Sequence, residues 1–150
     1  MESSAFDPRC RVLVVDDFPA WRIRICSLLE SMPDLEVVGQ ACDGLEAVQK
    51  AVELKPDLIL LDIGLPSING IEAASRIVED GACRPKILFV SENRDPDVVA
   101  EALTCQGALG YLLKTDVHTN LLPAVAAVQR GENFMSPGLK SRFPRGLIVA

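Results

Sequence analysis

Three acidic residues in this chain have the type and spacing of a divalent-cation site. Asp16 and Asp17 are adjacent and follow an apolar run near the N-terminus, and Asp62 ends another apolar run. In an open α/β sheet, side chains at the carboxyl ends of the central strands meet in one crevice. Carboxylates that converge in this way repel one another unless a cation compensates them. Mg²⁺ suits such a site, because it uses one or two carboxylates together with water and phosphate oxygens.

Two further polar residues stand at the ends of apolar runs and extend this chemistry to a phosphoryl group. Ser91 follows the fourth run and Lys114 ends the fifth. A phosphoryl group that moves onto Asp62 spreads negative charge over its oxygens. The Lys114 ammonium, the Ser91 hydroxyl with nearby backbone N–H groups, and a cation are suited to hold one oxygen each. No separate base is needed, because a carboxylate is already a nucleophile.

Short apolar runs alternate with segments of helical periodicity, which is typical of βαβ units around a parallel sheet. We predict five strands, at Arg11–Val15, Glu36–Ala41, Leu58–Asp62, Lys86–Val90 and Gly110–Leu113. Five helices are expected between and after them, and three begin at turn or cap signals: Asp43-Gly44, Asn69-Gly70 and Asp95-Pro96. Beyond Arg130 the pattern gives way to Gly and Pro. We therefore predict one domain over residues 9–131 and a linker-like tail over residues 132–150, with no output domain.

Composition narrows the class of protein. The formal net charge is −6, so direct contact with nucleic acid or an anionic membrane is not expected. The five cysteines are scattered and form no C-x-x-C pair, which indicates reduced, apolar filler rather than disulfides or a zinc site. No apolar run approaches the length of a bilayer crossing, and the N-terminus lacks the pattern of a signal peptide. We expect a cytoplasmic protein.

Four segments resemble the receiver domain of bacterial two-component response regulators. In chain order they are VLVVDDFPAWR, LILLDIGLPSINGIEA, ILFVSEN and GYLLKTD. The resemblance implies a flavodoxin-like, doubly wound sheet of five strands in the order 2-1-3-4-5. It also implies a switch rather than an enzyme, one that catalyses only its own phosphorylation and dephosphorylation. The phosphodonor would be a phosphohistidine on a sensor histidine kinase or a phosphotransfer protein.

The resemblance assigns roles to individual residues of the acidic site. Asp62 would be the phosphoacceptor. Asp17 and Asp62 would be direct Mg²⁺ ligands together with the Gly64 carbonyl, and Asp16 would act largely through water.

A second set of roles concerns signalling. Lys114 would pair with the phosphate, Ser91 would be the switch hydroxyl, and Tyr111 the aromatic side chain that turns inward behind it. The surface that changes would be formed by the fourth helix, the fifth strand and the fifth helix. Whether phosphorylated chains form homodimers stays open, as does the geometry of the Lys114-Thr115 peptide, where many receivers have Lys-Pro in the cis form.

The segments ACDGLEAV and GYLLKTD are most similar to receivers of the NarL/FixJ type, which usually continue into a helix-turn-helix domain. The tail ENFMSPGLKSRF resembles the start of the linker to such a domain. The chain is then a stand-alone receiver or the input half of a transcription regulator.

Three other functions fit the sequence less well. A phosphatase of the haloacid-dehalogenase type needs Asp-x-Asp, whereas Ile63-Gly64 follows Asp62 here. A flavin-binding module needs a hydroxyl-rich phosphate loop where this chain has two aspartates. A degenerate receiver that only binds partners would not need the full set of site residues.

Overall fold

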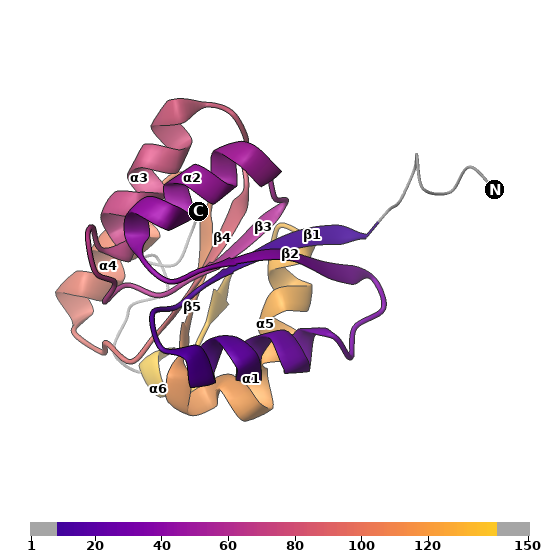
Figure 1. Ribbon diagram of the computed structural model, residues 1–150. Helices are drawn as coiled ribbons and strands as arrows, with labels where there is room; N and C mark the ends of the chain where they lie inside the picture. The colour runs from indigo at the N-terminus through magenta and orange to yellow at the C-terminus, as the bar shows by residue number, and fades with distance from the viewer. Residues whose placement is uncertain (1–8, 141–150) are drawn as a thin grey trace.

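The structure is a computed structural model, and it describes residues 9–140. Within this range six parallel strands form one sheet with helices on both faces (Figure 1). The strands are β1 (Cys10–Val15), β2 (Leu35–Ala41), β3 (Leu58–Leu61), β4 (Lys86–Ser91), β5 (Ala108–Leu113) and β6 (Phe134–Met135). The helices are α1 (Pro19–Leu29), α2 (Gly44–Leu54), α3 (Gly70–Asp80), α4 (Pro96–Leu103), α5 (Val117–Gln129) and α6 (Pro137–Lys140).

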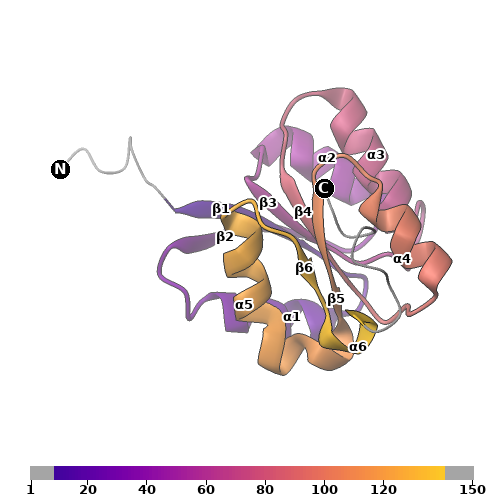
Figure 2. The same cartoon turned by 180° about the vertical axis from the view of Figure 1, so that it is seen from behind.

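The sheet order is β2-β1-β3-β4-β5-β6, so the predicted order of the first five strands is confirmed, while the predicted number of strands is wrong. The sixth strand, β6, lies in the segment predicted as a tail and pairs in parallel with β5 (Figure 2). Two residues are too few to show an apolar alternation, and Pro137-Gly138 follows them with the signal of a turn. The sixth helix, α6, was missed for the same reason. Residues 141–150 of the predicted tail lie outside the described part of the chain.

Each face of the sheet has its own hydrophobic core. Alternate residues of the strands point to opposite faces, so that Leu13 and Ile59 contact the α2, α3 and α4 side, while Val12 and Leu60 contact the α1 and α5 side (Figure 1). The four residues of β3 are at most 1% exposed. This burial on both faces explains why the central strands are almost continuously apolar.

The three helix starts predicted from cap residues are confirmed. The side chains of Asp43, Asn69 and Asp95 each accept a hydrogen bond from a backbone N–H in the first turn of α2, α3 and α4. Gly70, the first residue of α3, is required for packing: a Cβ there would lie 1.9 Å from the carbonyl oxygen of Asp62. The start of α3 is therefore pressed directly against the end of β3.

Two features of the structure bear on the cysteines and on the length of the helices. All five cysteines are free. Between residues 9 and 140, no helix has both the length and the hydrophobicity needed to cross a membrane.

Candidate functional site

The structure brings the acidic residues of the predicted site together at the carboxyl edge of the sheet. Asp16 and Asp17 follow β1, Asp62 follows the neighbouring strand β3, and one carboxylate oxygen of each lies within 4.8 Å of the other two. A pocket of about 570 Å³ opens beside them. Five of the predicted site residues line it: Asp17, Asp62, Gly64, Ser91 and Lys114.

Lys114 is the cation of the site. It is 6% exposed, and its ammonium nitrogen lies 2.7 Å from Asp16 Oδ2 and 3.0 Å from Asp62 Oδ2. Burial acts to lower the pKa of Lys114, but the two carboxylates outweigh it, and the pKa is raised. No peptide bond between residues 9 and 140 is cis, so the Lys114-Thr115 bond is trans and the side chain still reaches both aspartates.

Asp16 is the most buried of the three carboxylates, with 1% of its surface exposed. Burial raises its pKa, against the opposing effects of Lys114 and of a hydrogen bond of 2.9 Å that the Phe18 backbone N–H donates to Oδ1. Oδ2 contacts the Lys114 ammonium but accepts no well-directed hydrogen bond from any residue between 9 and 140. This oxygen therefore has unused capacity to accept.

The donor set fits Mg²⁺. It consists of oxygen atoms, the ligands that this ion prefers, and it leaves room for water and for phosphate oxygens in the adjoining pocket. Asp17 is exposed and lines the pocket, whereas Asp16 is buried and is not among the residues that line it. A direct ligand role suits Asp17, and a role through water suits Asp16.

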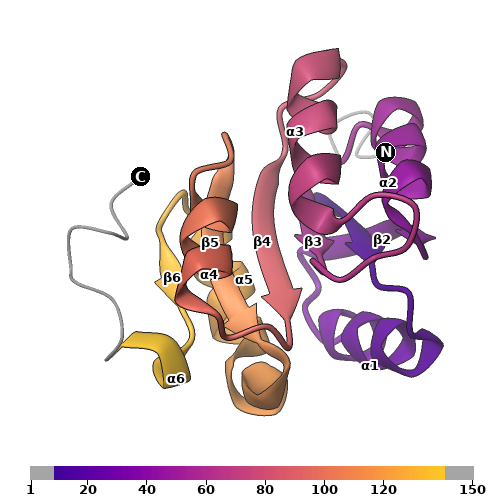
Figure 3. The ribbon, with the colours of Figure 1, turned by 90° about the vertical axis from the view of Figure 1, so that its left-hand side faces the viewer.

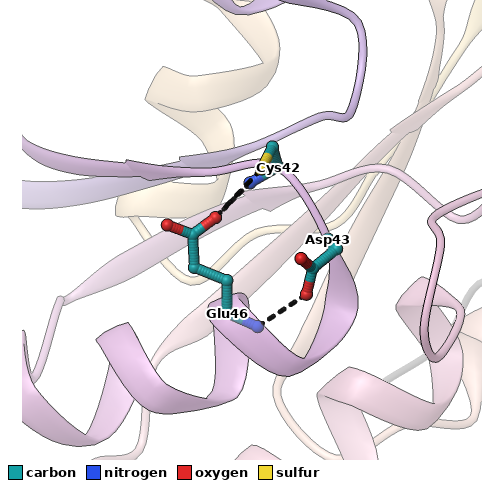
Figure 4. A group of neighbouring side chains, drawn as sticks. All are labelled: Cys42, Asp43 and Glu46. Carbon is teal, nitrogen blue, oxygen red and sulfur yellow. Dashed lines mark hydrogen bonds between the residues drawn. The ribbon is translucent and has the colours of Figure 1, made fainter.

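A second group of possible ligand atoms, from Cys42, Asp43 and Glu46, is explained by helix capping. Asp43 is the N-cap of α2 and accepts a hydrogen bond of 2.8 Å from the Glu46 backbone N–H (Figure 4). The Glu46 carboxylate turns back and accepts one of 2.8 Å from the Cys42 backbone N–H. This reciprocal pattern is close to a capping box, so it gives no reason to assign a metal site.

Ser91 and Tyr111 are connected through a residue that the sequence analysis did not assign to the site. Both side chains are buried. Asn93 donates its backbone N–H to Ser91 Oγ at 3.1 Å, and its carbonyl oxygen accepts a hydrogen bond of 2.7 Å from the Tyr111 hydroxyl. Burial raises the pKa of Tyr111 to about 12, although a hydrogen bond with Ser91 opposes the shift. Tyr111 is thus in the inward position in this structure.

The family of the chain is decided by comparison with known proteins. Residues 12–126 match the family described as the response regulator receiver domain. The chain belongs to this family. The sequence-based identification is confirmed, and the receiver has the flavodoxin-like α/β fold with a parallel sheet.

Relatives of the receiver include regulators of the NarL type, as predicted. The transcriptional regulatory protein LiaR of Bacillus subtilis (strain 168) is 40% identical over 132 residues, which are 88% of this chain and 60% of LiaR. The nitrate/nitrite response regulator protein NarL of Escherichia coli (strain K12) is 38% identical over 128 residues, 85% of this chain and 58% of NarL. A LuxR-family response regulator from Aurantimonas sp. SI85-9A1 superimposes with a TM-score of 0.81 at 33% identity, over 89% of this chain and 94% of that one.

The receiver spans about 60% of the length of these curated relatives. As a receiver it is a signalling domain of two-component systems, and the relatives show that such domains occur in longer regulators.

Trp21 packs against the core and also takes part in the pocket. Its ring packs against the core on the α1 and α5 side, but it also lines the pocket, with the Lys114 ammonium nitrogen 5.3 Å from its centre. Helical periodicity indicated only the packing face. The position of Trp21 five residues after Asp16, on the first turn of α1, was the available signal.

Proposed function

We propose that this receiver accepts a phosphoryl group on Asp62, beside a bound Mg²⁺ ion. The ligands would be the Asp17 and Asp62 carboxylates and the Gly64 carbonyl oxygen, with Asp16 acting largely through water. The observation that carries the proposal is the meeting of three carboxylates within 4.8 Å at the wall of an open pocket, two of them paired with Lys114. Bound Mg²⁺ would supply positive charge opposite the carboxylates and the incoming phosphate oxygens.

The residues of the site divide the chemistry among them. An Asp62 carboxylate oxygen forms a bond to phosphorus, the bond from phosphorus to the donor's imidazole nitrogen breaks, and the imidazole leaves with the electron pair. Asp62 Oδ1 already accepts a 2.7 Å hydrogen bond from the Ile63 backbone N–H, which orients the carboxylate. The Lys114 ammonium, which now contacts both Asp16 and Asp62, would also contact a phosphoryl oxygen and stabilise its negative charge.

Ser91 and Tyr111 would report the state of the pocket to the surface. Ser91 lines the pocket, and its Oγ accepts a 3.1 Å hydrogen bond from the Asn93 backbone N–H, so rotation of the hydroxyl would direct its hydrogen toward a phosphoryl oxygen. The Tyr111 hydroxyl donates a hydrogen bond to the carbonyl of the same Asn93. A movement of the loop after β4 would therefore change the hydrogen bonds of both Ser91 and Tyr111. The output surface would be formed by α4, β5 and α5, through a shift between two preformed states.

The partner that supplies phosphate would be a sensor histidine kinase or a phosphotransfer protein, in the cytoplasm. Two large apolar side chains at or near the start of α1 are exposed: Phe18, at 57%, and Ile23, at 68%. Phe18 also lines the pocket itself, so a partner that brings its histidine to Asp62 would cover it. A homodimer on phosphorylation is part of the proposal, as is a role as the input half of a transcription regulator.

Incubation with acetyl phosphate and Mg²⁺, followed by intact mass measurement, tests the proposal. We expect one phosphoryl adduct that requires Mg²⁺ and disappears in Asp62→Ala. The matched control is Asp57→Ala: Asp57 precedes β3 at the opposite edge of the sheet and bonds the Arg11 backbone N–H, so its removal should leave the adduct intact. Steady turnover of phosphoesters without an adduct would favour a phosphatase. Absence of Mg²⁺ uptake in calorimetry would contradict the metal site.

A further inference from the structure

The segment after α5 contributes a buried hydroxyl to the turn that carries Lys114. Strand β6 runs beside β5, and α6 lies at the carboxyl end of that strand (Figure 2, Figure 3). Between them is Ser136, which is 0% exposed. Its Oγ accepts a hydrogen bond of 3.0 Å from the Leu113 backbone N–H and donates one to Asp116 Oδ2. The Ser136 hydroxyl thus connects Leu113, which precedes Lys114, with Asp116, which lies two residues after Lys114.

Ser136 is itself held in place from both sides. Its backbone N–H donates to the Tyr111 carbonyl at 3.0 Å, and its carbonyl accepts from the Leu139 N–H at 2.9 Å. The neighbouring side chains of Met135 and Leu139 are 3% and 0% exposed and belong to the core on the α2, α3 and α4 side. The hydroxyl is therefore anchored to the sheet and does not depend on a loose loop.

The Asp116 side chain bonds Ser136 instead of capping helix α5. It is the N-cap residue of α5, a position where an aspartate side chain usually bonds a free N–H of the first turn. Here the Asp116 side chain makes no capping hydrogen bond to α5 and instead accepts from Ser136. Residues Lys114–Asp116 form a single 3₁₀ turn, so fixing Leu113 and Asp116 fixes the backbone from which the Lys114 side chain extends.

We propose that Ser136 is a positioning residue for Lys114. The Lys114 ammonium must lie between two carboxylates, 2.7 Å from one and 3.0 Å from the other, and a small rotation of its turn would break one contact. By clamping that turn, Ser136 keeps the ammonium at the place where a phosphoryl oxygen arrives. The inference rests on the proposed role of Lys114 in phosphoryl transfer, and it makes the segment through residue 139 part of the working receiver.

The test compares Ser136→Ala, Asp116→Ala and the double variant. At saturating Mg²⁺, the rate of adduct formation with acetyl phosphate should fall about tenfold in each, the effect of losing about 1.4 kcal/mol from the transition state. The double variant should be no slower than Ser136→Ala, because that substitution already removes the hydrogen bond to Asp116 together with the one from Leu113. Asp116→Asn, whose amide oxygen still accepts from the hydroxyl, should stay within about twofold of the wild type. Mg²⁺ affinity should be unchanged, since the carboxylates remain.

Two further measurements separate positioning from a loss of stability. Trp21, the only tryptophan, lies 5.3 Å from the Lys114 ammonium, so its emission without ligand should change in Ser136→Ala and not in Ile77→Val. Ile77 is 1% exposed on α3, and the shorter side chain lowers stability without touching the turn. Equal slowing in both variants, or a wild-type rate and wild-type emission in Ser136→Ala, would overturn the inference. If the wild type itself forms no adduct, the proposed function fails, while the emission comparison still decides whether Ser136 positions Lys114.

Discussion

Replacing Lys114 with methionine tests whether one cation keeps two buried carboxylates together. Methionine has a similar length and an apolar stem, so the substitution removes mainly the charge. Lys114 and Asp16 are 6% and 1% exposed, and removing one partner of a buried pair typically lowers the free energy of unfolding by about 3–5 kcal/mol. Because a domain has only about 5–15 kcal/mol in all, Lys114→Met should be folded but marginal at pH 7 without Mg²⁺.

The loss should depend on pH in a definite direction. Burial already raises the pKa of Asp16 in the wild type, and loss of the lysine raises it further. A carboxyl group with a folded pKa above its unfolded value binds its proton more tightly in the folded state. Such a group lowers the free energy of unfolding by its full amount at a pH above its pKa in the folded state. The effect vanishes at a pH below its pKa in the unfolded state, which is about 3.9. The difference in stability between Lys114→Met and the wild type should shrink as pH falls from 7 toward 4.

Added Mg²⁺ should restore part of the lost stability, because a bound ion compensates the same carboxylates. At tenfold excess over its dissociation constant, the ion adds about 1.4 kcal/mol. Urea unfolding followed by far-ultraviolet circular dichroism measures all three effects. The control is Lys86→Met, since Lys86 donates to the Gln129 carbonyl at 2.9 Å and should lose only about 1 kcal/mol, with no such pH dependence. A Lys114→Met variant within about 1 kcal/mol of the wild type, with a parallel pH profile, would refute the reasoning.

Three other predictions concern the switch and the loop after Asp62. Absorbance titration of Tyr111, the only tyrosine, should give a pKa near 12. Because the folded protein then disfavours the ionised phenol, the free energy of unfolding should fall by about 1.4 kcal/mol per pH unit as pH rises from about 10 to about 12. This loss should be absent in Tyr111→Phe. Ser91→Ala should still form the adduct but show a smaller change in near-ultraviolet circular dichroism on doing so; an undiminished change would count against its switch role. Gly70→Ala should lose about 1–3 kcal/mol in urea unfolding and Gly64→Ala under about 0.5, because an added Cβ meets the Asp62 carbonyl oxygen in the first case and open space in the second.

The strands that could be predicted from the sequence are those whose burial on both faces makes them almost wholly apolar. Strands β1, β3 and β4 are covered on both faces, so their sequences are almost wholly apolar and their central place could be inferred. Strand β6 could not be inferred, because its pairing depends on a neighbour rather than on its own pattern. Gly110 of β5 shows this dependence: a Cβ there would lie 2.8 Å from the Phe134 carbonyl oxygen, so the glycine is what admits the extra strand.

The site was predictable where side-chain identity carries the chemistry. Carboxylates and a lysine at strand ends are visible in the sequence, and the parallel topology brings them together. The link between Ser91 and Tyr111 through Asn93 was missed because it uses a backbone N–H and a carbonyl, which every residue other than proline possesses. Ser136 was missed because a serine before Pro137 reads as a turn, and only the pairing of β6 with β5 turns its hydroxyl toward Leu113.

The charges of the site make the cation and the phosphoryl group depend on each other. Three carboxylates and one ammonium carry a formal charge of −2, which opposes the approach of an anionic phosphoryl donor. A divalent cation cancels that charge. The proposed phosphorylation of Asp62 would replace the charge of that carboxylate with the larger charge of the phosphoryl group, so the site would attract a divalent cation more strongly than before. By linkage, a bound cation would shift the equilibrium of phosphoryl transfer toward phosphorylated Asp62 by the same factor by which phosphorylation raises the affinity for the cation. Lys114, which compensates only two of the three carboxylates, leaves this mutual dependence in place.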